Sequence, residues 1–178
     1  MQRPSYVGAA LLYMKIYTIT REQVIPKPVD EVFSFFSRPE NLGRLTPRNL
    51  GFQILTPSPV RMKEGALIDY KINLLGFPVR WRSMISLYDP PRTFVDEQLG
   101  GPYSFWHHTH EFVKAGQGTL VRDRVLYVMP FGFLGDLLQK FLVRRKLDRI
   151  FQYRSQLMEE IFSSGKLYSL FDETILDK

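Results

Sequence analysis

All three histidines of this 178-residue chain lie within four positions, in the segment GPYSFWHHTHEF (residues 101–112). Because successive side chains of a β-strand point to opposite faces, an extended segment places His108 and His110 on one face and His107 on the other. The residues that share the face of the first pair are Trp106 and Phe112. Two imidazoles on such an apolar surface could orient a ligand, transfer a proton or bind a metal ion.

Acidic residues on neighbouring strands are the expected partners of these imidazoles. If a turn at 115–118 joins two strands, His110 lies opposite Asp123, and strand parity places Asp96 and Gln98 on the same face. Buried polar groups are costly unless they are paired, so we expect an internal network in which His110 pairs with Asp123. The carboxylates of that network would hold one histidine tautomer or raise the pKa of an imidazole.

Two other kinds of chemistry stay open for this patch. A metal site would use His108 and His110 as a His-x-His pair on a strand, with an oxygen ligand from Asp123. No fourth ligand is evident and the neighbours are bulky aromatics, so we expect no metal ion. An enzyme would use His110 and Asp123 as the general base, with Tyr127 or Tyr70 as proton donor. The chain has no recognisable nucleophile, phosphate loop or cofactor motif, so we expect no cofactor and favour binding over catalysis.

The composition is that of a single folded domain with a large apolar interior. Of the 178 residues, 44% are hydrophobic and 24% are charged, and the aromatic residues are 14 Phe, 9 Tyr and 2 Trp. This aromatic content suits a core, a large apolar cavity, or both. The absence of cysteine excludes disulfides and thiolate metal sites. The net charge of +6 weakly favours acidic partners or anionic membrane surfaces, and the dispersed basic residues argue against nucleic-acid binding.

The apolar pattern predicts a strand, two short helices and then a nearly continuous series of strands. Residues 15–25 alternate as a strand does. A helix is expected from Pro28 to Ser37, and the residues of its apolar stripe are Val29, Val32, Phe33 and Phe36. A short helix and loop follow at Pro39–Pro47. The six strands expected next are 51–60, 66–75, 78–88, 93–99, 103–114 and 119–128.

Pairing these strands outward from their turns tests whether they form one sheet. The turns used are Gly76-Phe77, Asp89–Arg92, Gly100–Pro102 and Ala115–Gly118. The pairs expected are Ile72 with Trp81, Ile85 with Asp96, Asp96 with Trp106, His110 with Asp123, and Trp106 with Tyr127. One face is then largely apolar and consists of Ile68, Tyr70, Ile72, Leu74, Trp81, Ile85, Leu87, Phe94, Trp106, His108, His110, Phe112, Val121, Val125 and Tyr127. The other face is charged and consists of Asp69, Lys71, Arg80, Arg82, Glu97, Glu111, Arg122 and Arg124, which predicts an antiparallel meander covered on one side.

A long helix is expected to cover the apolar face. Helical spacing is kept within Leu134–Phe162 by Leu134, Leu137, Leu138, Phe141, Leu142, Leu147, Ile150, Phe151, Leu157, Met158, Ile161 and Phe162. Most of the basic residues occupy the other side: Lys140, Arg144, Arg145, Lys146, Arg149 and Arg154. We expect a domain at 15–162, an N-terminal extension at 1–14 and a loosely attached tail at 163–178. No apolar run is long enough to cross a membrane and the N-terminal run is a poor signal peptide, so a cytoplasmic location is the default.

Four segments carry a resemblance to a known family. VIPKPVDEVFSFFSRPENLGRLTP (24–47) resembles the opening of the polyketide cyclase/START-like (SRPBCC) superfamily. RWRSMISLYDPPRTFVDEQLGGPYSFWHHTHEF (80–112), GTLVRDRVLYVMPFG (118–132) and IFQYR (150–154) resemble one ligand-binding branch, whose members are often labelled "SRPBCC family protein" or "cell division inhibitor". The resemblance covers about residues 15–162 and implies an α+β helix-grip fold (START-like/Bet v 1-like), in which an antiparallel curved sheet wraps around a long C-terminal helix.

The resemblance also implies a deep pocket between sheet and helix. Relatives include lipid-transfer domains, quinone-binding proteins and aromatic polyketide cyclases. We therefore expect a carrier or sensor of a hydrophobic or amphipathic small molecule such as a lipid, quinone or polyketide. A cyclase- or dehydratase-like enzyme acting in the same pocket is the alternative. The residues expected at the ligand site are Tyr70, Trp81, Phe94, Asp96, Gln98, Trp106, His108, His110, Phe112, Asp123, Tyr127, Phe141 and Phe151.

Two apolar tips raise the question of surface contacts. Polar residues are usual at turns, yet Leu75-Gly76-Phe77 and Phe131-Gly132-Phe133-Leu134 are apolar. The simpler interpretation is that these tips pack on the helix. The alternative is that they gate the pocket or make a weak membrane-surface contact, with help from Arg144, Arg145 and Lys146.

Overall fold

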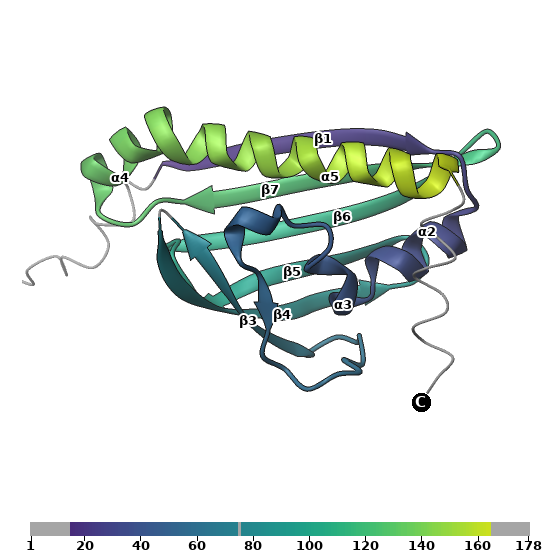
Figure 1. Ribbon diagram of the computed structural model, residues 1–178, viewed down its shortest axis with the longest axis horizontal. Coiled ribbons are helices and arrows are strands. Elements are labelled where there is room, and N and C mark those ends of the chain that lie inside the picture. The colour runs from purple at the N-terminus through teal and green to yellow at the C-terminus, as the bar shows by residue number, and fades with distance from the viewer. Residues whose placement is uncertain (1–14, 75, 165–178) are drawn as a thin grey trace, which may run out of the picture.

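The computed structural model describes residues 15–74 and 76–164 of the chain. Within these residues the fold is α+β, with seven strands in one antiparallel sheet and a long C-terminal helix (Figure 1). The elements, in chain order, are β1 (Ile16–Ile25), α2 (Val29–Phe36), α3 (Pro39–Leu42), the 3-10 turn η2 (Arg48–Leu50), β2 (Gln53–Ile54), β3 (Leu67–Leu74), β4 (Phe77–Asp89), β5 (Thr93–Gly100), β6 (Phe105–Ala115), β7 (Gly118–Val128), α4 (Gly132–Leu138), the π-helical turn η3 (Gln139–Val143) and α5 (Arg144–Ser164). This order confirms the predicted helix-grip fold.

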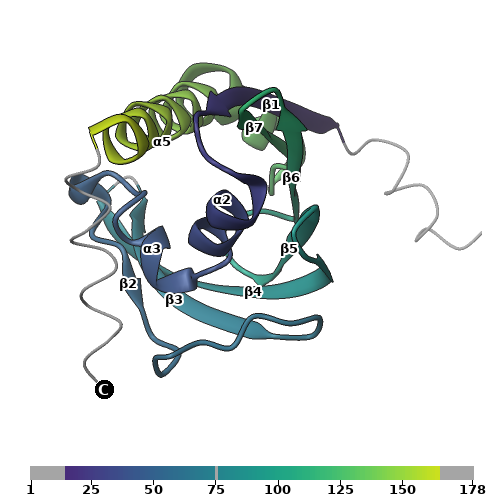
Figure 2. The same ribbon diagram turned by 90° about the vertical axis from the view of Figure 1, so that its right-hand side faces the viewer.

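The sheet is strongly curved. Strands β2 to β7 form the predicted meander, and β1 joins its far edge beside β7, with Ile16 opposite Val128 and Ile25 opposite Thr119. Figure 2 shows the sheet bending around α2, while α5 lies across the open side between the two edges of the sheet. The concave face of the sheet is therefore covered by α5 along its open side and by α2 and α3 at one end.

Helix α2 closes that end because its apolar face fits the concave side of the sheet. The helix begins after Pro28 and carries Asp30 and Glu31 in its first turn, where the helix dipole favours negative charge. Phe33 meets the ring of Phe112 on β6 edge to face, with 5.3 Å between centroids. The buried residues of α2 are Val32, Phe33 and Phe35; Phe36, which we expected in the stripe, is only half-buried.

The strand register confirms three of the five predicted pairs. Ile85 lies opposite Asp96, His110 opposite Asp123, and Trp106 opposite Tyr127. The other two predictions were wrong by two residues, because the chain turns at different positions from those assumed. The pairs found instead are Tyr70 with Trp81, Ile72 with Val79, and Asp96 with His108. A shift of two residues keeps each side chain on its predicted face, so the division into an inner and an outer face survives.

Two local predictions about the strands were also wrong. Instead of a strand at 51–60, β2 covers only Gln53 and Ile54, and the two prolines that follow at 57 and 59 have no backbone N–H to donate. Leu87 was expected inside but is 42% exposed. A register irregularity between Ile85 and Leu87 reverses the alternation of β4, and Tyr88 takes the inward position against Phe33.

The prediction that the apolar residues of the C-terminal helix cover the sheet is confirmed for the second half of the helix and wrong for the first half. The residues of α5 that are buried against the sheet and α2 are Leu147, Phe151, Met158, Ile161 and Phe162. The apolar residues nearer its start are all exposed: Leu134, Leu137, Leu138, Phe141 and Leu142. Helix α4 extends past the end of β7 (Figure 1), and in η3 the buried residue that contacts β7 is Gln139, so Phe141 and Leu142 lie on the outer side.

The expected extension at 1–14 and nearly all of the expected tail at 163–178 lie outside the described residues. Among the described helices, none combines the length and the hydropathy that spanning a membrane requires.

Candidate functional site

Two histidines and two aspartates form a compact buried group on the concave face, which we call the His–Asp cluster: Asp96, His108, His110 and Asp123. The rings of His108 and His110 lie 3.8 Å apart between centroids. Nε2 of His108 lies 3.0 Å from Oδ1 of Asp123, and Nε2 of His110 lies 3.1 Å from Oδ2 of Asp96. Each imidazole also turns its Nδ1 to the other carboxylate, at 3.5 Å for His108 to Asp96 and 2.8 Å for His110 to Asp123.

The cluster forms where three adjacent strands place alternate residues at the same height. On β6, His108 and His110 point to the concave face; β5 places Asp96 opposite His108, and β7 places Asp123 opposite His110. His107 lies on the convex face as predicted, where its Nδ1 is 2.8 Å from Oε1 of Glu97. The network was predicted in outline, but Asp96 lies beside the imidazoles rather than beside Trp106, and His108 shares Asp123 with His110.

The cluster holds its two carboxylates in the ionised form. Burial alone would raise the pKa of Asp123, but the hydrogen bonds and charges of both imidazoles outweigh burial and bring the pKa well below its ordinary value. Burial opposes ionisation of Asp96 as well. The hydrogen bond from His110, the charges of the imidazoles and the charge of Arg154 nevertheless lower its pKa.

The surroundings shift the pKa values of the two histidines in opposite directions. Burial and the charge of His110 lower the pKa of His108. Burial would also lower the pKa of His110, but its contacts with Asp123 and Asp96 reverse that effect and raise the pKa. The arrangement therefore favours a charged His110 and a neutral His108. Because the neutral His108 has one N–H, its short contact to Asp123 is the one in which Nε2 donates.

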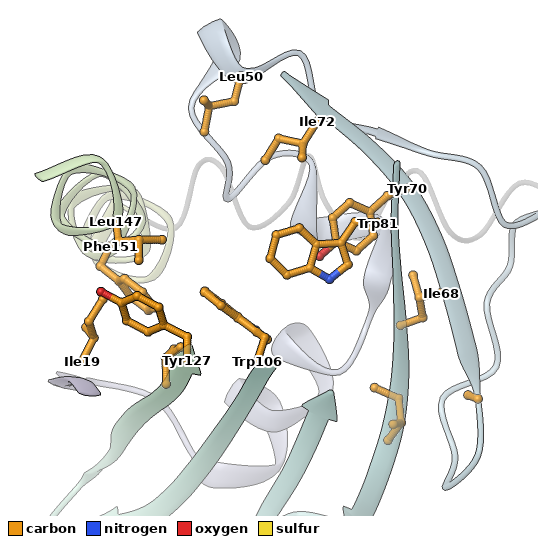
Figure 3. Close-up of a cluster of buried hydrophobic side chains, with 13 residues drawn as sticks. Ile19, Leu50, Ile68, Tyr70, Ile72, Trp81, Trp106, Tyr127, Leu147 and Phe151 are labelled. Atoms are coloured by element: carbon orange, nitrogen blue, oxygen red, sulfur yellow. The ribbon is translucent and has the colours of Figure 1, made fainter. Parts of the chain in front are cut away.

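A cavity of about 160 Å³ lies beside the cluster, between the sheet, α5 and the segment from α2 to β2. Figure 3 shows Leu147 and Phe151 of α5 on one side of this region, with Trp106 below them and Trp81 across from them. Tyr70 and Trp81 are stacked with ring centroids 5.6 Å apart, and Trp106 meets Trp81 edge to face at 5.2 Å. The cavity is thus lined by aromatic and aliphatic side chains, with the polar cluster at one part of its wall.

Eight of the thirteen residues expected at the ligand site line this cavity: Tyr70, Trp81, Phe94, Asp96, Trp106, His108, His110 and Phe151. Five do not. Asp123 lies behind the imidazoles, Gln98 bonds through its side chain to the backbone of Tyr103, and Phe112 packs against α2. The Tyr127 hydroxyl accepts a hydrogen bond from Gln139 at 3.1 Å, and Phe141 is 59% exposed on the outside of the helix.

Sequence reasoning missed several residues of the wall. Arg154, which we assigned to the solvent side of the helix, lines the cavity, and its guanidinium lies 5.4 Å from the ring of Phe151. Tyr103 comes from the β5–β6 turn and contacts both tryptophans. The remaining unexpected lining residues near the α2–β2 segment are Phe36, Arg38, Pro39, Leu42, Leu45, Thr46, Phe52 and Met62. The spacing of Arg154 three residues after Phe151, on one helix face, was the available clue.

A metal ion could be held by the same residues. Asp96, His108 and His110 each offer a ligand atom, and these atoms lie within 4.8 Å of one another. Asp123 stands behind the two imidazoles, where it could orient them by hydrogen bonds. The competing arrangement is the network itself, in which Nε2 of each imidazole is hydrogen-bonded to a carboxylate. The sequence pointed to Asp123 as the oxygen ligand, whereas the geometry puts Asp96 in that position.

Comparisons with known proteins agree with this architecture. A family model described as "Polyketide cyclase / dehydrase and lipid transport" matches residues 25–151. No curated protein sequence matches the chain significantly. The crystal structure of TTHA0849 from Thermus thermophilus is similar, with a TM-score of 0.65, 19% identity, and coverage of 84% of this chain and 99% of that one.

Two plant proteins share the fold at similarly low identity. Norcoclaurine synthase from Thalictrum flavum, in complex with dopamine and hydroxybenzaldehyde, has a TM-score of 0.61 and 15% identity, covering 90% of this chain and 95% of its own. Major latex-like protein 151 from Panax ginseng has a TM-score of 0.51 and 14% identity, covering 78% of this chain and 97% of its own. At such identities the likeness concerns the fold.

Proposed function

This chain belongs to the polyketide cyclase/dehydrase and lipid transport family, and we propose that it binds a hydrophobic or amphipathic small molecule, such as a lipid, quinone or polyketide, in the cavity between sheet and α5. The observation that carries the proposal is the cavity itself. Its walls are aromatic and aliphatic, and one polar group of limited extent, the His–Asp cluster, lies among them. Ligand sites commonly combine an apolar lining with a few polar groups that fix orientation.

The size of the cavity limits the ligand. A cavity of about 160 Å³ is comparable to the roughly 150 Å³ apolar cavity known to bind benzene in another protein. A molecule with one or two rings fits this space better than a long acyl chain. The polar cluster would orient such a molecule by hydrogen bonds at one side, while the tryptophans contact its apolar part.

Narrowing the cavity tests the proposal. Leu74 is a half-buried cavity residue on β3, and Leu67 is an exposed residue of the same strand. We expect Leu74→Trp to weaken binding of acetylnaphthalene, a neutral two-ring probe, about tenfold or more in isothermal titration calorimetry, because the larger ring occupies the space. Leu67→Trp is the matched control and should leave the affinity unchanged. Equal binding by both variants and the wild type would place the probe elsewhere and contradict the proposal.

Co-purified material gives an independent test of the same idea. Native mass spectrometry and solvent extraction of the purified chain should yield a small apolar molecule, and the Leu74→Trp variant should carry less of it. Recovery of the same amount from both proteins would count against the cavity as the binding site.

Catalysis in the cavity is the second candidate, and one observation favours it. His108 has a lowered pKa and its neighbour His110 a raised one, so a neutral base and a charged acid lie side by side in the cavity wall. This arrangement supports general base chemistry of the kind a cyclase or dehydratase uses. The neutral His108 is the imidazole free to accept a proton, whereas the sequence assigned that role to His110. The structural neighbour norcoclaurine synthase is an enzyme of the same fold.

Hydrogen exchange measures such a base without knowledge of the natural substrate. We expect the protein to accelerate exchange of the α-hydrogens of acetylnaphthalene in deuterated water, followed by proton NMR. His108→Ala should abolish the acceleration, whereas His107→Ala, on the convex face of the same strand, should retain it. An exchange rate equal to that in buffer would remove the enzymatic candidate.

We also propose that the start of the C-terminal helix contacts an anionic membrane surface. Phe131 and Phe133 are each 80% exposed. The exposed apolar residues that follow them are Leu134, Leu137, Leu138, Phe141 and Leu142. Basic residues lie next to this patch at Lys140, Arg144 and Arg145 and are exposed too. Apolar side chains that enter the interface, together with lysine and arginine, are the features that bind proteins to anionic lipid surfaces.

Flotation with vesicles tests the membrane contact. At low salt we expect the protein to float with vesicles that contain phosphatidylglycerol and to stay behind with pure phosphatidylcholine. The double variant Phe131→Ser/Phe133→Ser should no longer float. The same change at Phe77, an exposed apolar residue of the β3–β4 hairpin, tests whether a second tip takes part. Absence of flotation at low salt, or dimerisation through the patch in light scattering, would overturn this assignment.

A further inference from the structure

A second cavity, of about 240 Å³, lies on the other side of the His–Asp cluster, between β1, β7 and α5. The cavity described above is called the main cavity from here on. Three residues line both cavities: Phe36, Phe151 and Arg154. The cluster is also divided between them, because its two imidazoles line the main cavity and Asp123 lines the second cavity. The two cavities therefore share one wall.

The lining of the second cavity is the more polar of the two. Its charged and polar lining residues are Arg21, Glu22, Gln23, Asp123, Gln152, Arg154 and Ser155. Of these, Arg21, Glu22 and Gln152 are exposed, so the second cavity lies at the surface. Beside it, Nε2 of Gln23 donates a hydrogen bond to the backbone carbonyl of Ser155 at 2.9 Å, which joins β1 to the neighbouring α5 (Figure 1). From the main cavity to the second cavity, the surroundings change from aromatic to hydrogen-bonding.

Arg154 lies in the shared wall and offers a free donor there. Its Nε is buried and has no acceptor among the described residues. Buried N–H groups are nearly always paired, because an unpaired donor loses its hydrogen bond to water and gains nothing in return. The guanidinium lies 5.4 Å from the ring centre of Phe151, and such a side chain can change rotamer when a ligand passes it. A ligand that extends from one cavity into the other would therefore meet this donor.

The charges around the second cavity balance. The charged residues that line it are two basic and two acidic ones: Arg21, Arg154, Glu22 and Asp123. The partners already present are Asp148 for Arg21, Arg122 for Glu22, and the two imidazoles for Asp123. A carboxylate placed here would meet the charges of Glu22 and Asp123. An ether or hydroxyl oxygen accepts the hydrogen bond of Arg154 without adding a charge.

We infer that the second cavity is a subsite for an uncharged chain that carries ether or hydroxyl oxygens, attached to a ring system that occupies the main cavity. This inference rests on the proposed binding function and adds a polar part to the ligand. The oxygen nearest the rings accepts the hydrogen bond of Arg154, and Gln152 and Ser155 are donors for the rest of the chain. Arg38 lines only the main cavity, so its charge acts on the ring end of the ligand.

Naphthyl ethers test this inference by isothermal titration calorimetry on the full chain. The methyl ether probes the main cavity alone, and three others carry side chains of nearly equal length: methoxyethoxyethyl, heptyl and carboxyhexyl. We expect the methoxyethoxyethyl ether to bind about 3- to 10-fold more tightly than the heptyl ether, because its oxygens accept hydrogen bonds from the polar lining. The carboxyhexyl ether should bind more weakly than the methoxyethoxyethyl ether because of Glu22 and Asp123.

Filling the second cavity locates the side chain of the ligand. Ser155 and Gln152 line the second cavity and not the main one, whereas Gln156 is exposed and lines neither. Ser155→Phe should weaken binding of the methoxyethoxyethyl ether about tenfold and leave that of the methyl ether within about twofold. Gln152→Phe should do the same from an exposed position. Gln156→Phe is the matched control and should bind every ether as the wild type does.

A variant of the shared wall tests the donor. Arg154→Lys keeps the positive charge beside the cluster and lacks the Nε donor, so it should lower the preference for the methoxyethoxyethyl over the heptyl ether about threefold. Thermal melts establish that each variant is folded.

The outcomes distinguish the inference from the function beneath it. If the methyl ether fails to bind, the proposed binding function fails. If the methyl ether binds and the longer ethers bind no more tightly, or if Ser155→Phe and Gln152→Phe affect no ether, the second cavity is not a subsite. If the heptyl or the carboxyhexyl ether binds most tightly, or if Arg154→Lys keeps the full preference, the assignment of an uncharged, oxygen-bearing chain is wrong.

Discussion

Replacing Asp123 with Asn removes one charge from the buried His–Asp cluster and keeps the shape of the side chain. The carboxylate lies 3.0 Å from Nε2 of His108 and 2.8 Å from Nδ1 of His110, and 10% of the side chain is exposed. Breaking a buried ion pair by removing one partner costs about 3–5 kcal/mol, because the other charge stays buried without compensation. We expect Asp123→Asn to lose about 3 kcal/mol, near the lower limit, since Asp96 remains beside both rings.

The loss should depend on pH in a defined way. The pKa of Asp123 is lowered in the folded protein, so its contribution is fully present above the unfolded value of about 4 and is lost as the pH falls below it. The pKa of His110 is raised, so its contribution is fully present below the unfolded value of about 6.5 and is lost as the pH rises through the folded value. The difference between wild type and variant is therefore greatest near pH 5, as an approximate midpoint of these two values.

Urea denaturation followed by tryptophan fluorescence measures this difference across the pH range. A loss of about 3 kcal/mol corresponds to a fall in Tm of roughly 6–12 °C for a domain of this size. Asp69→Asn is the matched control, because Asp69 pairs with Arg82 on the convex face, where water screens the pair and little stability is at stake. A variant as stable as the wild type near pH 5, or a loss that keeps growing above pH 8, would refute the ion-pair interpretation of the cluster.

Three further results are expected. Gly135→Ala should destabilise the protein by at least about 2 kcal/mol in thermal melts, because the added Cβ would lie 1.9 Å from the carbonyl oxygen of Pro130, whereas Gly100→Ala meets open space and should be nearly neutral. Tyr17→Phe removes the hydrogen bond to Asp136 (2.9 Å) and should lower the free energy of unfolding by about 1 kcal/mol. In the wild type, burial is the main cause that raises the pKa of Tyr17 to about 12, and ultraviolet titration should detect this pKa. Metal analysis of untagged, chelator-free protein should find no stoichiometric ion, and a full equivalent of zinc or iron would replace the network interpretation of the His–Asp cluster with a metal site.

The parts of the site that could be predicted depend on local periodicity. Strand alternation alone assigned His107 to the convex face and His108 and His110 to the concave face, and the short β6–β7 turn was enough to pair His110 with Asp123. Both features depend on a few consecutive residues. A wrong assignment of another strand or turn therefore leaves these two predictions unchanged. The pair Glu111 and Arg122 on the convex face, 3.0 Å apart, follows from the same turn.

The parts that could not be predicted depend on how the chain turns or on what lies across the fold. The β5–β6 turn lies later in the chain than assumed. The residue opposite Asp96 is therefore His108 and not Trp106, two residues further along β6. The register irregularity in β4 turns Leu87 outward, and no residue type in that strand indicates that irregularity. Phe141 is exposed because η3 turns Gln139 toward Tyr127 of β7 and Phe141 away from the sheet. Residue spacing within the helix does not show which side of η3 faces the sheet.

By itself the sequence determined the series of strands, the two faces of the sheet, the long covering helix and the polar pair on the apolar face. These features follow from the side-chain periods of two residues in a strand and 3.6 in a helix, which neighbouring residues show directly. Only the tertiary structure decided that two carboxylates enclose two adjacent imidazoles, and that Arg154 reaches the cavity. Distances between separate strands, and the position of a helix over a curved sheet, are set by the packing of the whole core. That packing is also what leaves Trp81 and Arg154 with buried donors and no acceptor among the described residues.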